Sequence, residues 1–73
     1  MTDNITFEIV EHIGTITPAT EKSWAKEINR ISWNGVVKWD VRQWDESHSK
    51  CSKGITLTDD EIRNLYELLA DRF

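Results

Sequence analysis

The segment ISWNGVVKWDVRQW, residues 31–44, combines large aromatic side chains with cations. It contains three of the four tryptophans of the chain and two basic residues: Trp33, Trp39, Trp44, Lys38 and Arg42. Single-stranded nucleic acid exposes bases that stack on aromatic rings, with about 1 to 3 kcal/mol per stacked base, while Lys and Arg neutralise its phosphates. The segment is therefore the first candidate for a binding surface.

The alternative is that these aromatic side chains serve packing. An aromatic cluster in a small domain is more often part of a core than a ligand platform. On this alternative Trp33 or Trp44, or both, are buried in a dimer interface and the cations are solvated. The residue pattern leaves both interpretations open and slightly favours burial.

Positive charge is concentrated around the tryptophans, although the net charge of the chain is −4. Residues 22–53 carry seven Lys and Arg against four Asp and Glu, a balance of +3, whereas residues 1–21 carry −4 and residues 54–73 carry −3. Charges farther away than about 10 Å are screened at ordinary salt. The middle of the chain can therefore bind a polyanion in spite of the acidic total.

Other chemistries find little support in the sequence. His48-x-x-Cys51 offers two metal ligands where a structural zinc site needs four, and His12 is the only other histidine. The three glycines form no phosphate-binding loop, and 73 residues offer little volume for a shielded cleft around a nucleophile. We expect no enzyme, no metal site and no cofactor.

Composition predicts one folded domain over residues 1–73, with 38% hydrophobic and 30% charged residues. A single core is marginal at this size, and small domains of this kind often add an oligomer interface. Cys51 is the only cysteine, and the sequence shows no signal peptide and no apolar run of about 18 residues. We therefore expect a cytoplasmic protein without a disulfide or a membrane span.

The dipeptide Asn34-Gly35 must position the candidate surface, because it predicts a two-residue hairpin turn of type I′. Opposite pairs then run from Trp33 with Val36 to Ala25 with Trp44. One face of the hairpin carries a mostly apolar set, the predicted core: Ile28, Arg30, Val37, Trp39 and Val41. The other face, the predicted binding face, carries Ile31, Trp33, Lys38, Asp40, Arg42 and Trp44. On that face Glu27 lies opposite Arg42 and offers it an internal partner.

The remaining elements flank this hairpin. Residues 5–17 predict a long bent strand with a bulge near Val10 or Gly14, and residues 53–57 predict a short final strand. Thr58 to Glu61 form a capping box that begins a helix from Asp59 to about Asp71. Its apolar stripe is predicted to pack on the sheet: Ile62, Leu65, Tyr66, Leu69 and Phe73. Leu68 lies off the stripe, either as a lone exposed leucine or as a dimer contact.

WNGVVKWDVRQW, followed after a polar loop by KGITLTDDE, resembles the transcriptional positive cofactor 4 (PC4/p15) family of coactivators, and in particular its short bacterial YdbC-like branch. The shared features are an aromatic hairpin with its Gly, a strand with Asp-aliphatic-Arg, and Lys-Gly-Ile before the helix. The resemblance covers roughly residues 24–70. The family's hairpin lysine is Asn34 here, and the basic residue before Lys53 is Ser52.

The resemblance implies an α+β fold, with a strongly bent four-stranded antiparallel sheet followed by one C-terminal helix, and a homodimer that binds single-stranded DNA across the sheet. It implies that Trp33 stacks on a base, that Arg42 and Lys53 contact the DNA, and that Trp44 holds the second aromatic position. Lys53 shares its parity with Ile55 and Leu57, so it needs a bulge or a strand end to reach that face.

Together the residues and the resemblance predict a non-enzymatic protein that binds single strands with little sequence preference, in transcription or DNA maintenance, in a bacterial nucleoid-associated setting. The predicted contact residues are Trp33, Lys38, Arg42, Trp44 and Lys53, with Lys26 and Lys50 as weaker candidates. RNA serves the same stacking and phosphate chemistry, so it stays an alternative ligand. The other alternative is a module whose exposed tryptophans dock a protein, and a component of the transcription machinery is a further candidate partner.

Overall fold

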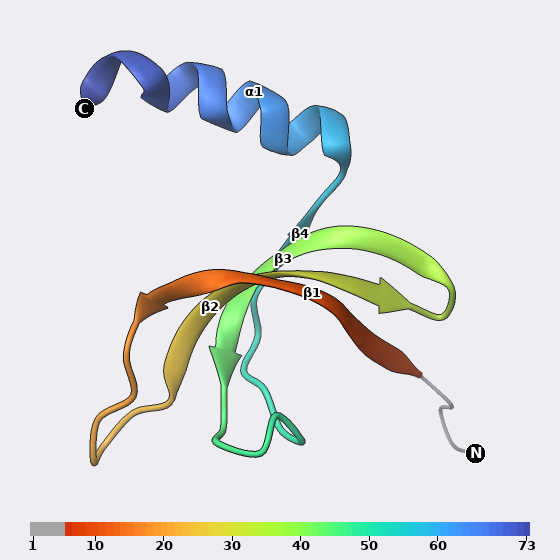
Figure 1. Cartoon of the computed structure of the whole chain (residues 1–73), viewed down its shortest axis with the longest axis vertical. Helices are drawn as coiled ribbons and strands as arrows, with labels where there is room; N and C mark the ends of the chain where they lie inside the picture. The colour runs from red at the N-terminus through yellow and green to blue at the C-terminus, as the bar shows by residue number, and fades with distance from the viewer. Residues whose placement is uncertain (1–5) are drawn as a thin grey trace.

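The structure, a computed structural model, describes residues 6–73 as a four-stranded antiparallel sheet followed by one C-terminal helix (Figure 1). The strands lie in the order β1-β2-β3-β4, which confirms the predicted α+β class. Their bounds are β1 Phe7–Thr17, β2 Ala25–Trp33, β3 Val36–Trp44 and β4 Ile55–Leu57, followed by α1 Asp59–Leu69 and a 3-10 turn, Ala70–Arg72. The expected first residue of β1, Ile5, lies outside the described residues.

The hairpin between β2 and β3 has the predicted turn and register. Asn34 has φ of 52° and Gly35 has φ of 91°, the positive values that a type I′ turn requires. The pairs run without interruption from Trp33 with Val36 to Ala25 with Trp44. The division of side chains between the two faces of the hairpin is therefore the predicted one.

Strand β1 is more irregular than its sequence suggests. Its register against β2 shifts three times, so that Val10, Ile13 and Ile16 are each left without an opposite residue. A bulge was predicted near Val10 or Gly14, and the register shifts at both places, between Ile9 and Glu11 and between His12 and Gly14. The bulges keep Phe7, Ile9 and His12 opposite alternate residues of β2, and thus on one face of the sheet.

Strand β4 and helix α1 are present as predicted, but β4 begins later than expected. The strand begins at Ile55 rather than Lys53, and pairs with the middle of β3. The Oγ1 of Thr58 accepts a bond from the Glu61 amide at 3.2 Å, and Glu61 Oε1 accepts one from the Thr58 amide at 2.8 Å. The capping box is thus complete, and the helix it begins ends two residues before the predicted Asp71.

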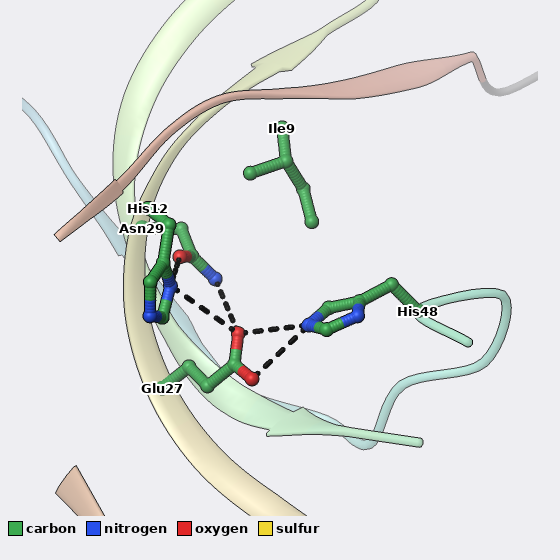
Figure 2. Close-up of a pocket in the computed structure, with 5 residues that line it drawn as sticks. All are labelled: Ile9, His12, Glu27, Asn29 and His48. Carbon is green, nitrogen blue, oxygen red and sulfur yellow. Dashed lines mark hydrogen bonds and ion pairs between the residues drawn. The ribbon is translucent and has the colours of Figure 1, made fainter. Parts of the chain in front are cut away.

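The buried side chains lie on the predicted binding face, which corrects the expected position of the core. They are Glu27, Asn29, Ile31, Asp40 and Trp44, whereas Val37 of the expected core is 43% exposed and Trp39 is half-buried. The physical reason is curvature: β2 and β3 bend around this face, and Ile9 and His12 of β1 lie on the inside of the bend (Figure 2). We call it the concave face.

The prediction that the helix stripe packs on the sheet is wrong for the single chain. No residue of α1 is buried, and Leu68 is 72% exposed. Figure 1 shows α1 standing apart from the curved strands and joined to them through β4. Its tie to the sheet is at its first residue, where Trp39 Nε1 donates to Asp59 Oδ1 at 2.8 Å. Within residues 6–73, Ile62 is the one stripe residue that is partly buried, and the other stripe residues are exposed.

Candidate nucleic-acid interface

The concave face brings together side chains from three strands. Pairing places Phe7 opposite Trp33 and His12 opposite Asn29, while β3 contributes every second residue from Lys38 to Trp44. Aromatic, cationic and carboxylate groups therefore share a single curved surface. Of the predicted contact residues, Trp33, Lys38, Arg42 and Trp44 lie on it.

The aromatic rings form one continuous cluster. Phe7 lies between two tryptophans, with ring centroids 5.6 Å from Trp33 and 5.5 Å from Trp44. His48 extends the cluster beyond Trp44, with the centroids of these two rings 5.6 Å apart. Trp44 is 1% exposed, so the expectation that its ring faces outward is wrong. It supports the cluster from beneath and offers no ring face to a base in this structure.

Arg42 occupies the centre of the concave face. Its guanidinium lies 4.9 Å from the centroid of the Trp33 ring, and its Nε donates to Asp40 Oδ1 at 2.7 Å. Nη1 also donates to the Ser52 carbonyl oxygen at 3.5 Å. These contacts fix the plane of the guanidinium beside the ring on which a base is predicted to stack, and Nη2 makes none of them.

Asp40 is the charge partner of Arg42, and it is fully buried. Burial raises the pKa of the Asp40 carboxyl, and the bond from Arg42 only partly offsets this because Oδ2 has no hydrogen-bond partner among the described residues. Burial disfavours the charged form of Arg42, but the hydrogen bonds and charge interactions with Asp40 and Cys51 together outweigh it and raise the Arg42 pKa. The guanidinium therefore stays charged on the concave face.

Two open hollows meet at Arg42. The first is lined by Trp33, Asn34, Val36, Lys38, Arg42 and Thr56. The second is lined by Arg42 together with Lys26, Lys53 and the segment from Ser52 to Ile55, among others. The structure thus brings five of the seven predicted residues to the face or its edge. Lys26 pairs with Gln43 and alternates with Glu27, so it lies on the opposite face of the sheet. Lys50 lines neither hollow and is exposed in the loop after β3.

Gly54 explains how Lys53 reaches this edge. A Cβ atom on Gly54 would collide with the carbonyl oxygen of Val41 and with Cβ of Arg42. Only glycine permits so close an approach of the chain to β3. Strand β4 begins after Gly54, at Ile55, so Lys53 lies outside the strand and does not follow its alternation. This is the strand end that Lys53 was expected to need in order to reach the binding face.

A buried carboxylate between two histidines is a feature that the sequence did not indicate (Figure 2). His48 Nε2 lies 3.0 Å from both carboxylate oxygens of Glu27, and His12 Nδ1 lies 3.7 Å from Oε1. Asn29 joins them, since its Nδ2 donates to Glu27 Oε1 at 3.1 Å and its Oδ1 accepts from His12 at 2.6 Å. Only the pairing of β1 with β2 and the fold of the loop after β3 bring these residues together.

The Glu27 carboxyl stays ionised in this setting. Burial alone would raise its pKa, but the hydrogen bonds from Asn29 and His48, with the positive charge of the two histidines, lower the pKa below its ordinary value. The two imidazoles approach the carboxylate from different sides, as Figure 2 shows, rather than converging on one point. Within residues 6–73 no group of three His, Cys, Asp or Glu side chains is arranged to hold a metal ion.

His48 and Cys51 separate in the structure, although their spacing first suggested a pair of ligands. The imidazole of His48 binds Glu27, whereas Cys51 Sγ accepts from Arg42 Nη1 at 3.8 Å.

In the described part of the chain, the helix is too short and too polar to cross a membrane.

Comparisons with known proteins match most of the chain. The sequence model of the family described as Transcriptional Coactivator p15 (PC4) matches residues 20–68 of the chain. An uncharacterized protein of Treponema pallidum (strain Nichols) is 40% identical over 68 residues, which cover 92% of this chain and 79% of that protein. The family match spans the hairpin, β4 and most of α1.

Proposed function

Because the chain belongs to the Transcriptional Coactivator p15 (PC4) family of non-enzymatic DNA-binding proteins, we propose that it is a homodimeric protein that binds single-stranded DNA with little sequence preference. The observation that carries this proposal is the hollow in which Trp33, Lys38 and Arg42 meet on the concave face. It joins an aromatic ring and two cations, the two elements that single-strand binding requires.

The proposed contacts follow from the position of each side chain. Trp33 stacks on a base, and Arg42 and Lys38 beside it bind the adjoining phosphates. Lys53 continues the cationic path at the edge of the face, and Lys26 contributes positive charge from the opposite side of the sheet, along the second hollow. Lys50, exposed in the loop after β3, is a peripheral phosphate contact. Trp44 holds the cluster in place from beneath, a supporting role in place of the direct stacking expected from sequence.

The face opposite the concave one supports the homodimer. Val37, Ile55 and the stripe residues Leu65 and Leu69 are each at least 38% exposed. A second copy of this chain would cover the apolar stripe that the first copy leaves open, and would leave both concave faces free. Single-strand binding places the protein with bacterial DNA in the cytoplasm, in transcription regulation or DNA maintenance, where the transcription machinery is a candidate partner.

Titration with oligo-dT, with RNA of matched length and with double-stranded DNA, at two salt concentrations, tests the proposal through tryptophan fluorescence. We expect oligo-dT to quench the fluorescence, and the log of the affinity to fall against the log of salt with a slope of about −0.7 per phosphate contact. No quenching by either single strand at low salt would contradict the proposal. Tighter binding of RNA would change the ligand, and a salt-insensitive signal would indicate a protein partner.

A further inference from the structure

We propose that Phe7 is a further base-stacking residue of the concave face, and that Asn34 is the positioning residue that holds it there. The proposal rests on the proposed single-strand binding and names a contact for it in β1, a strand that the sequence interpretation left out of the site. It also gives a role to Asn34, which stands where the resemblance would place a lysine.

Asn34 fastens the start of β1 to the hairpin turn. The Thr6 amide donates to Asn34 Oδ1 at 2.8 Å and the Thr6 hydroxyl donates to the same oxygen at 3.0 Å. In return the Asn34 amide donates to the Thr6 carbonyl oxygen at 2.8 Å. Three hydrogen bonds therefore fix the residue immediately before Phe7, and one side-chain oxygen accepts two of them. A lysine at this position has no acceptor and could not form that contact.

The clamp sets Phe7 beside the ring of Trp33. The two residues pair directly across β1 and β2, and their rings are tilted by 37° with centroids 5.6 Å apart. Asn34 and Trp33 line the same hollow as Lys38 and Arg42. The ring of Phe7 is thus held at the margin of the predicted base site.

Phe7 and Trp44 differ in how far their rings are exposed to solvent, and therefore in function. Phe7 is 40% exposed, whereas Trp44 behind it is 1% exposed. The second aromatic surface open to a base next to Trp33 is therefore that of Phe7, with Trp44 packed against its inner side. A ring needed only to cover Trp44 would gain more stability from complete burial, because apolar area left in water contributes nothing.

The first test compares Phe7→Leu with Ile13→Ala, a control in the same strand at a bulge position with 43% exposure. Leucine keeps an apolar cover over Trp44 but removes the ring. Anisotropy of labelled oligo-dT should show an affinity at least about five-fold weaker for Phe7→Leu, and no change for the control. Equal affinity of Phe7→Leu and the wild type would overturn the proposal.

The second test separates positioning from direct contact. Asn34→Gly keeps a residue that accepts positive φ and removes the side-chain clamp. We expect it to weaken binding in the wild type and to have no further effect in the Phe7→Leu background, because the two act through one ring. An equal loss in both backgrounds would refute the positioning role.

A third measurement needs no variant. Oligo-dT carrying 5-iodouracil is photocrosslinked to the wild-type protein and the adducts are located by mass spectrometry. An adduct on Phe7 is expected, whereas adducts confined to other residues would overturn the proposal even if Phe7→Leu fails to fold. If the wild type does not bind oligo-dT at all, the proposed function itself fails, an outcome distinct from every result above.

Discussion

Arg42 combines a structural and a binding role that its sequence position does not reveal. The predicted register offered Glu27 as its internal partner, but in the structure the mostly buried guanidinium pairs with Asp40. Glu27 contacts His48 and His12 instead. A buried charge left without its partner is costly, because water cannot solvate it. The two roles must therefore be separated experimentally.

We predict that Arg42→Ala lowers the free energy of unfolding by about 3 kcal/mol, because it leaves Asp40 buried and unpaired. The double variant Asp40→Asn with Arg42→Ala removes both charges and should recover most of that stability without recovering affinity for oligo-dT. Urea denaturation and anisotropy measured on the same samples check both statements. If the double variant binds as tightly as the wild type, Arg42 has no part in binding.

The lowered pKa of the Glu27 carboxyl predicts that the fold is sensitive to acid. Its pKa is lower in the folded protein than in the unfolded chain, so its ionised form stabilises the fold at every pH above the ordinary glutamate pKa of about 4.3. That contribution is lost as the pH falls through the lower pKa of the folded state. Asp40 has the opposite sign: its pKa is raised, so protonation in acid relieves a cost.

Glu27→Gln isolates the first of these effects. At pH 7 the variant should unfold with about 1 to 2 kcal/mol less free energy than the wild type, because it loses charge-assisted hydrogen bonds from His48. The difference should shrink steadily below pH 4, where the wild-type carboxyl becomes protonated as well. Chemical denaturation between pH 3 and pH 7 measures it. A difference that stays constant across this range would show that Glu27 is not the titrating group.

At the scale of elements, local sequence signals predicted the turn and the start of the helix. Features that depend on contacts between distant parts of the chain were not predicted. The Asn34-Gly35 turn and the Thr58 capping box each depend on a few neighbouring residues whose backbone needs are specific. The position of the core did not follow from alternation, because alternation defines two faces without stating which one bends inward. Three bulges in β1 contribute to the bend, whereas the sequence pattern indicated only one, near Val10 or Gly14.

The candidate site divides in the same way. Trp33, Lys38 and Arg42 lie in one hairpin and were predictable from its register. Phe7 and the histidine pair around Glu27 depend on how β1 and a loop meet that hairpin, which are contacts between parts distant in the sequence. Trp44 was assigned to the correct face, and its burial depends on Phe7 lying over it. Composition and local spacing contain no information on such coverage.

At the scale of the whole molecule, the exposed apolar surface opposite the concave face is the dominant feature. Leu68 of α1 is 72% exposed, and Phe73, which follows the 3-10 turn, is fully exposed. Apolar area of this extent on a small chain is typical of an interface. A dimer would stabilise each copy by mass action, so folding and association would be coupled.

We predict that the apparent melting temperature rises with protein concentration, as expected when association and folding are linked. Leu69→Lys, in the stripe, should yield monomers of lower stability, whereas Glu67→Lys, two residues away on α1 and off the stripe, should dimerise as the wild type does. Sedimentation equilibrium gives the mass of each variant, and calorimetry at several concentrations gives the melting temperatures. A wild-type mass of one chain at all concentrations, with a constant melting temperature, would show that the apolar face serves another partner.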